Sequence, residues 1–171
     1  MTSKEKPTVV WFQAITCNGN THSLLSANSS RLELFFNSFN LIYHPSLTIE
    51  KTLDDILNQK EQIDFLLIEG AITSNEKFFS ISNDTTFNLL NKLALKSKYI
   101  IAVGSCASNG GIHTKFTQNN DIQGINDSID KQTINKLEHS IINLTGCPVH
   151  PEWILQTLFS LRDYGKMNLD E

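Results

Sequence analysis

The sequence has little that would suit a membrane span, a nucleic-acid partner or an export signal. Its longest apolar runs, residues 64–72 and 99–104, fall far short of the roughly 20 residues that a spanning helix needs. The 14 lysines and arginines are scattered among 18 acidic residues, and the net charge of −4 argues against nucleic-acid binding. The amino terminus, MTSKEKPTVV, has neither a long apolar stretch nor twin arginines. We therefore expect a cytoplasmic protein with no direct membrane insertion.

Phosphate-binding motifs are also missing. No G-x-G-x-x-G follows the first apolar run, and no G-x-x-x-x-G-K-S/T loop occurs anywhere. The absence of these motifs argues against a flavodoxin-like module that binds a flavin or a nucleotide, and this hypothesis is the least favoured one.

Cysteine is scarce, with only Cys17, Cys106 and Cys147 in 171 residues. An odd number of widely spaced cysteines excludes a disulfide framework, which a reducing cytosol would disfavour in any case. Zinc sites usually contain a closely spaced C-x₂₋₄-C pair, and this chain has none.

Short apolar runs alternate with helical patterns along the chain, which predicts one domain over residues 1–171. The expected strands are residues 8–14, 39–45, 64–70, 99–104 and 139–146. The expected helices are a segment capped by Thr21, residues 31–39, 47–62 capped by Thr48, 87–98 and 151–165. We expect a loop near residues 75–87 and a polar surface excursion with little core at 113–132. This alternation predicts an α/β fold with a doubly wound, mostly parallel sheet and helices on both faces.

Each cysteine follows the end of an expected strand. Cys17 follows residues 8–14, Cys106 follows 99–104, and Cys147 follows 139–146. Because the carboxyl ends of parallel strands lie at one edge of a sheet, the three thiols are expected to converge there. Buried cysteines that only fill space are the alternative. Soft thiolates suit an iron–sulfur cluster, zinc or cuprous copper, and the missing C-x₂₋₄-C pair favours iron–sulfur.

Five segments resemble, in order, the motifs of the small subunit of nickel–iron hydrogenases, a family related to the 20-kDa subunit of NADH:quinone oxidoreductase. They are CNGNTHSLL (17–25), LIYHPSLTIE (41–50), LIEGAI (67–72), GSCASNGGI (104–112) and TGCPVHPEWI (145–154). The resemblance covers nearly the whole chain. It implies a flavodoxin-like domain that holds the proximal 4Fe-4S cluster beside a nickel–iron large subunit.

The resemblance also implies which residues bind the cluster. Cys17, Cys106 and Cys147 match three of the four ligands, whereas Asn20 stands at the position of the fourth. His22 stands where the family often has a glutamate, and Glu69 matches the acidic residue of its EG motif. We expect the family's carboxy-terminal domain, with its medial and distal clusters, to be absent. The nickel ligands belong to the large subunit, so this chain is expected to be at most a non-catalytic electron-transfer subunit.

The missing fourth cysteine leaves several alternatives open. The cluster is expected to be 3Fe-4S, or 4Fe-4S with water, Asn20 or His22 on the fourth iron. Histidine is the better donor by chemistry, since it replaces cysteine in some clusters, although an exposed helical histidine is the commoner role. A second functional hypothesis is an accessory paralogue that assists hydrogenase assembly or activity, with hydrogenase assembly factors as its partners and an incomplete cluster or none.

Two other residues have expected structural roles. We expect Trp11 to lie in the core. His44 lies in one of the five matching segments, and a functional role is the alternative. We expect the structural role, in which it shapes the turn before Pro45 as a solvent-exposed residue.

Overall fold

The computed structural model describes residues 5–81, 83–115, 117 and 121–167. The first four residues, the last four, residue 82 of the expected loop and four residues of the polar stretch 113–132 therefore lie outside the described part. No helix in the described ranges is long and apolar enough to cross a membrane.

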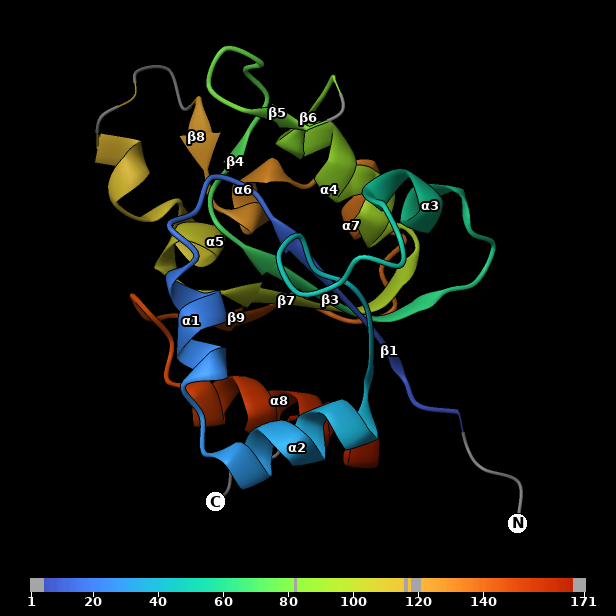
Figure 1. The fold of residues 1–171 in the computed structure, drawn as a ribbon. Coiled ribbons are helices and arrows are strands. Elements are labelled where there is room, and N and C mark those ends of the chain that lie inside the picture. The colour runs from blue at the N-terminus through green and yellow to red at the C-terminus, as the bar shows by residue number, and fades with distance from the viewer. Residues whose placement is uncertain (1–4, 82, 116, 118–120, 168–171) are drawn as a thin grey trace.

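A five-stranded sheet forms the centre of the domain (Figure 1). Its strands are β1 (Thr8–Gln13), β2 (Asn40–Tyr43), β3 (Ile63–Glu69), β7 (Ser97–Val103) and β9 (Ile142–Leu144). Neighbouring strands are parallel, in the order β2-β1-β3-β7-β9. This flavodoxin-like order confirms the expected α/β fold. It places the switch point, where such folds bind ligands, between β1 and β3.

Helices cover both faces of the sheet, as Figure 1 shows. One face carries α1 (Gly19–Leu25), α2 (Ser29–Ser38) and α8 (Pro151–Tyr164). The other carries α3 (Leu53–Asn58), α4 (Thr86–Ala94), α6 (Ile125–Ser128) and α7 (Lys131–Ile134). The short helix α5 (Ser105–Asn109) follows β7, and a 3₁₀ helix spans Gly111–Lys115. Two small antiparallel pairs complete the fold: β4 (Ile72–Thr73) with β8 (Ile122–Gln123), and β5 (Ser80–Ile81) with β6 (Asp84–Thr85).

The core consists of two apolar layers on either side of the sheet. Val9 and Trp11 of β1 pack with α2 and α8, whereas Val10 and Phe12 pack with α3 and α4. All four side chains are fully buried. Strands covered on both faces need apolar residues at every position, which is why β1 reads as a continuous hydrophobic run.

Several local expectations were wrong. The helix predicted over residues 47–62 begins at Leu53, because Thr52 and Asp55 form a reciprocal capping box at its start. Thr48 instead accepts a hydrogen bond from the His44 backbone N–H. Thr21 lies inside α1, whose N-cap is Asn18.

The stretch 113–132 also differs from the expected surface excursion. Ile122, Ile125 and Ile129 are buried, and β8 and α6 lie within it. Ile122 lies in β8, Ile125 begins α6 and Ile129 follows that helix, so no single regular element contains all three. Buried residues spread over such short elements give no sustained periodic pattern, and the surrounding asparagines and aspartates made the stretch look polar. The expected loop near 75–87 likewise contains the β5–β6 pair.

Candidate functional site

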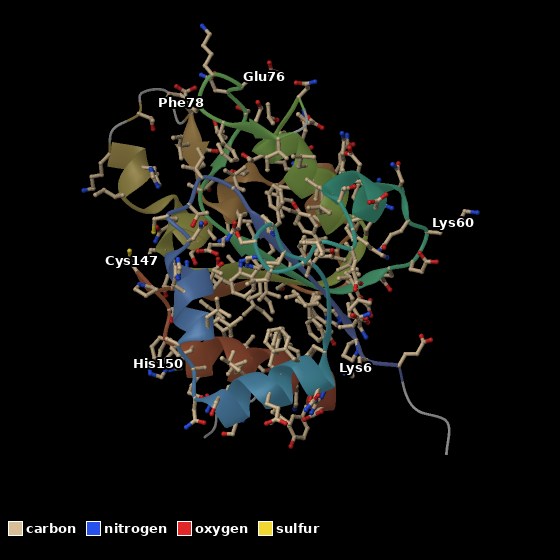
Figure 2. The ribbon with its side chains drawn as sticks, in the orientation of Figure 1. Lys6, Lys60, Glu76, Phe78, Cys147 and His150 are labelled. Carbon is tan, nitrogen blue, oxygen red and sulfur yellow. The ribbon has the colours of Figure 1, made fainter. Side chains whose placement is uncertain are left out.

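The three cysteines lie at the carboxyl edge of the sheet. Cys17 is in the turn between β1 and α1, and Cys147 is in the segment between β9 and α8. Both are exposed, and Figure 2 shows Cys147 at the edge of the molecule. Cys106 also follows its strand, but it is half-buried and is the second residue of α5, so it lies in a short helix and not in a loop. All three thiols are free.

The thiols are near enough to influence one another electrostatically. Burial raises the pKa of the Cys106 thiol, and the negative charges of Cys147, Cys17 and Glu69, in that order, raise it further. A negative charge on a neighbouring group therefore makes ionisation of the Cys106 thiol less favourable in the chain without metal. Cations such as iron ions would relieve this repulsion by binding the thiolates.

Glycine residues lie close to the sulfur atoms of Cys106 and Cys17. A Cβ on Gly111 would lie 2.8 Å from the Cys106 sulfur, and one on Gly19 would lie 3.3 Å from the Cys17 sulfur. Gly111 also has a φ of +57°, a left-handed conformation that glycine adopts at little cost. The two glycines let the backbone approach these sulfurs closely.

The described thiols do not surround a single metal ion. No group of three histidine, cysteine or acidic side chains in the described ranges is arranged to do so. An iron–sulfur cluster differs from a mononuclear site, because each cysteine binds a different iron and the ligand sulfurs lie farther apart. Three free thiols on one edge, with glycines at two of them, fit such a cluster better than a zinc ion.

Glu69, at the end of β3, is a fully buried carboxylate at the switch point. It accepts hydrogen bonds from Trp11 Nε1 (3.0 Å), Gln13 Nε2 (3.2 Å), Thr16 Oγ1 (3.1 Å), Thr21 Oγ1 (2.5 Å) and the backbone N–H groups of Asn20 (3.0 Å) and Thr21 (3.4 Å). These donors offset the cost of burying the carboxylate. They also fix the path of the chain from Cys17 into α1.

Glu69 was recognisable from its sequence motif, whereas most of its partners were not. Gln13 pairs with Glu69 in the register of the sheet, and Trp11 lies two residues earlier on the same face of β1. A polar residue ending an otherwise apolar strand was the signal available in the sequence. Trp11 is fully buried, as expected, and its indole N–H is used in the site.

His44 joins this network from the turn after β2. The Ser46 backbone N–H donates to its Nδ1 at 3.0 Å, so the proton is assigned to Nε2, which lies 3.2 Å from Thr21 Oγ1. Burial lowers the pKa of His44, and the charge of Glu69 partly opposes that effect. The residue does shape the turn, but the expectation of solvent exposure was wrong, since it is 1% exposed.

Asn20 and His22 lie two residues apart on α1 but in different surroundings. Asn20 is 8% exposed, and its carboxamide faces backbone groups of two other segments: Nδ2 donates to the Val103 carbonyl at 3.2 Å, and Oδ1 accepts from the Val149 N–H at 2.9 Å. His22 is exposed on the surface of the helix. The structure brings Asn20 between the cysteine-bearing segments, whereas it leaves His22 facing solvent.

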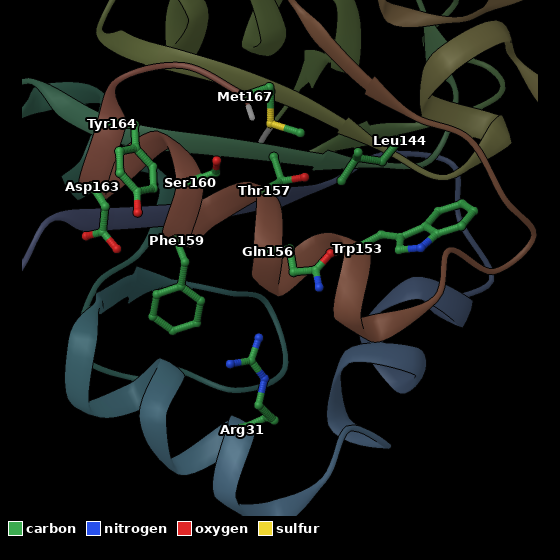
Figure 3. Close-up of a pocket in the computed structure, with 10 residues that line it drawn as sticks. All are labelled: Arg31, Leu144, Trp153, Gln156, Thr157, Phe159, Ser160, Asp163, Tyr164 and Met167. Atoms are coloured by element: carbon green, nitrogen blue, oxygen red, sulfur yellow. The ribbon is translucent and has the colours of Figure 1, made fainter. Parts of the chain in front are cut away.

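Two surface hollows of the described chain are lined by other residues. One, of about 590 Å³, lies along α8 and is shown in Figure 3. It is lined by Arg31, Leu144, Trp153, Gln156, Thr157, Phe159, Ser160, Asp163, Tyr164 and Met167. The second, of about 480 Å³, is lined by residues 126, 134 and 137–141. No cysteine lines either hollow.

A parallel sheet of this strand order, with three free cysteines at its carboxyl edge, defines a flavodoxin-like α/β domain. Residues 17–161 match the family described as the 20-kDa subunit of NADH ubiquinone oxidoreductase. The chain belongs to this family, and its resemblance to hydrogenase small subunits is confirmed by the relatives that follow.

Two curated relatives illustrate that resemblance. The periplasmic NiFeSe hydrogenase small subunit of Desulfomicrobium baculatum is 31% identical over 173 residues, which cover 90% of this chain and 54% of the relative. The periplasmic NiFe hydrogenase small subunit 1 of Nitratidesulfovibrio vulgaris Hildenborough is 27% identical, over 100% of this chain and 55% of the relative. The chain thus spans about half the length of these relatives.

A solved structure supports the same relationship. A crystal structure of a reduced, active form of the Ni-Fe-Se hydrogenase from Desulfomicrobium baculatum superimposes with a TM-score of 0.77 at 27% identity. The match covers 98% of this chain and 67% of the hydrogenase chain.

Proposed function

We propose that this chain is a hydrogenase small-subunit-like electron-transfer protein, in which Cys17, Cys106 and Cys147 hold one iron–sulfur cluster. Its partner is the nickel–iron large subunit of a hydrogenase. The observation that carries the proposal is the grouping of three free thiols at one sheet edge, close enough to raise the pKa of Cys106.

An iron–sulfur cluster, when bound, supplies reversible one-electron transfer. The residues of this chain determine where that cluster is held and how exposed it is. Cys17 and Cys147 bind from the solvent-exposed side, and Cys106 binds from the half-buried side. The network around Glu69 keeps the turn bearing Cys17 in place, and such outer contacts tune a metal site.

The fourth corner of the cluster has no cysteine. The cluster is therefore 3Fe-4S, or 4Fe-4S with a non-cysteine ligand on one iron. His22 is exposed and offers an imidazole from α1, and Asn20 or a water molecule are the other candidates.

An accessory role is the second candidate function. It is favoured by one observation: Asn20 stands where the resemblance implies a fourth ligand, and its carboxamide bonds to backbone groups. In this case the chain assists the assembly or activity of a hydrogenase, binds its assembly factors, and holds an incomplete cluster or none. A cytoplasmic location is proposed for both roles.

The first experiment measures iron and acid-labile sulfide, with electron paramagnetic resonance, on chain purified without oxygen. About four irons with a signal in the reduced state support a 4Fe-4S carrier, whereas about three with a signal in the oxidised state support 3Fe-4S. Serine replacements of each cysteine are expected to lower the iron content, and Ser140→Ala, at an exposed serine, is the control. A colourless protein that retains no iron after reconstitution would contradict the electron-transfer proposal.

A second experiment separates the two roles. The chain is tagged in its own cell, and the active hydrogenase is isolated. Stable presence of the chain in the active enzyme supports an electron-transfer subunit. Loss of hydrogenase activity on deletion, with no chain in the purified enzyme, supports the accessory role.

A further inference from the structure

The side chain of Asn20 is committed to protein backbone on both sides. Its Oδ1 accepts a hydrogen bond from the Val149 N–H at 2.9 Å, and its Nδ2 donates one to the Val103 carbonyl at 3.2 Å. Its own backbone N–H donates to Glu69 Oε1 at 3.0 Å. With 8% of its surface exposed, the residue has little contact with water that could replace these bonds.

These contacts connect the segments that carry the three cysteines. Asn20 follows Cys17 by three residues, Val103 precedes Cys106 by three, and Val149 follows Cys147 by two. The three segments are distant in sequence and meet at this one carboxamide. A change in the position of Asn20 would therefore be transmitted to all three thiols.

Neighbouring groups reinforce the arrangement. Ser23, one turn later on α1, donates to the Val149 carbonyl, so both backbone groups of Val149 are held by the same helix. The Gly104 N–H donates to the Leu144 carbonyl, and the Ser105 N–H donates to the Gly146 carbonyl, both at 2.8 Å. These bonds join the start of α5 to the end of β9 and to the segment that follows it.

We infer that Asn20 is a positioning residue that holds the three cysteine-bearing segments in register through its carboxamide and does not itself ligate iron. The assignment of those segments to a cluster rests on the proposed function, whereas the hydrogen bonds do not. The carboxamide thus provides a structural link at the position where the resemblance implies a metal ligand.

The inference is tested on the full chain, before and after removal of iron with a chelator. Asn20→Ala is expected to lower the thermal midpoint by about 4–8 °C in both forms, because two buried hydrogen bonds are lost and each corresponds to about 2–4 °C in a domain of this size. The Val149 amide, followed by NMR hydrogen exchange, is expected to lose its protection. Asn20→Asp keeps an acceptor for Val149 and is expected to retain much of that protection.

Iron release to the chelator distinguishes positioning from general destabilisation. Asn20→Ala is expected to release iron several-fold faster than the wild-type chain. Ile56→Val shortens a fully buried side chain of α3, away from the cysteines, and is the matched destabilised control. Ile56→Val is expected to lower the midpoint without changing iron release.

Two results would overturn the inference. In the first, the Asn20→Ala midpoint falls only in the iron-loaded chain, which would make Asn20 a ligand. In the second, Val149 exchange and the midpoint are unchanged. If the wild-type chain holds no iron but Asn20→Ala still removes the protection of the Val149 amide, the electron-transfer proposal is refuted. The hydrogen-bonding role of Asn20 is then still supported.

Discussion

Asn20 lies so close to Gly104 that a Cβ on Gly104 would sit 2.4 Å from the Asn20 Nδ2 atom. Gly104 also has a φ of +94°, which side-chain-bearing residues rarely adopt. The glycine between β7 and α5 therefore makes room for the carboxamide that joins the cysteine-bearing segments.

Gly104→Ala is expected to destabilise the chain by about 2–4 kcal/mol, because it adds both a steric clash and backbone strain. The double variant with Asn20→Ala removes the clash but keeps the strain. The double variant should therefore lose less free energy of unfolding than the two single variants lose in sum, by about 1 kcal/mol. Urea unfolding of the four chains measures this difference, and strict additivity would show that the two residues do not contact each other.

Glu69→Gln is expected to cost about 2–5 kcal/mol of folding free energy. A glutamine replaces one acceptor oxygen by an amide that donates, so donors now bonded to the carboxylate are left buried and unpaired. Glu61→Gln, at an exposed glutamate, is the control and should change stability by less than about 0.5 kcal/mol. Equal losses in the two variants would contradict the described network.

His44 is expected to make the folded chain less stable in mild acid. Because burial lowers its pKa in the folded state, the unfolded chain binds a proton first as the pH falls below about 6.5. Stability is then lost until the pH reaches the lower pKa of the folded state. Unfolding free energies measured from about pH 7 to pH 5 should fall less steeply in His44→Gln than in the wild type. Identical slopes would refute this prediction.

The three thiols should react at different rates in the reduced, metal-free chain. Cys106 is half-buried and its pKa is raised, so at neutral pH it presents less thiolate than a free cysteine does. Iodoacetamide followed by mass spectrometry should show Cys106 alkylated several-fold more slowly than the exposed Cys17 and Cys147. If Cys106 were the fastest of the three cysteines to be alkylated in the wild type, its burial and raised pKa would be contradicted.

Asn20→Cys offers a thiol at the position of the missing ligand. If the wild-type cluster lacks one cysteine ligand, this variant should hold more iron per chain and survive longer in air. It should also unfold at a lower temperature when metal-free, because cysteine cannot make both hydrogen bonds of the carboxamide. Unchanged iron content and unchanged stability in air would count against a three-cysteine cluster.

The regular parts of the fold were predictable because their signals are local. The continuous apolar run of β1 predicts a strand covered on both faces, and Val9 to Phe12 are indeed buried. Pro151 and Gly165 mark the two ends of α8, where proline lacks an N–H that the helix does not need and glycine takes a left-handed conformation. The start of α3 was missed because two threonines, Thr48 and Thr52, were both plausible caps. Only the second is followed at the right spacing by Asp55.

The sequence by itself determined the α/β class, the parallel sheet and the placement of Cys17, Cys106 and Cys147 after strand ends, because all of these depend on patterns within a few residues. Tertiary structure decided the surroundings of Asn20 and His44. Asn20 meets Val149 from 129 positions away, and His44 meets Thr21 from 23 positions away. Such partners depend on how strands are ordered in the sheet. A polar side chain becomes a buried link rather than a solvent-exposed group only when that order places unpaired backbone groups beside it.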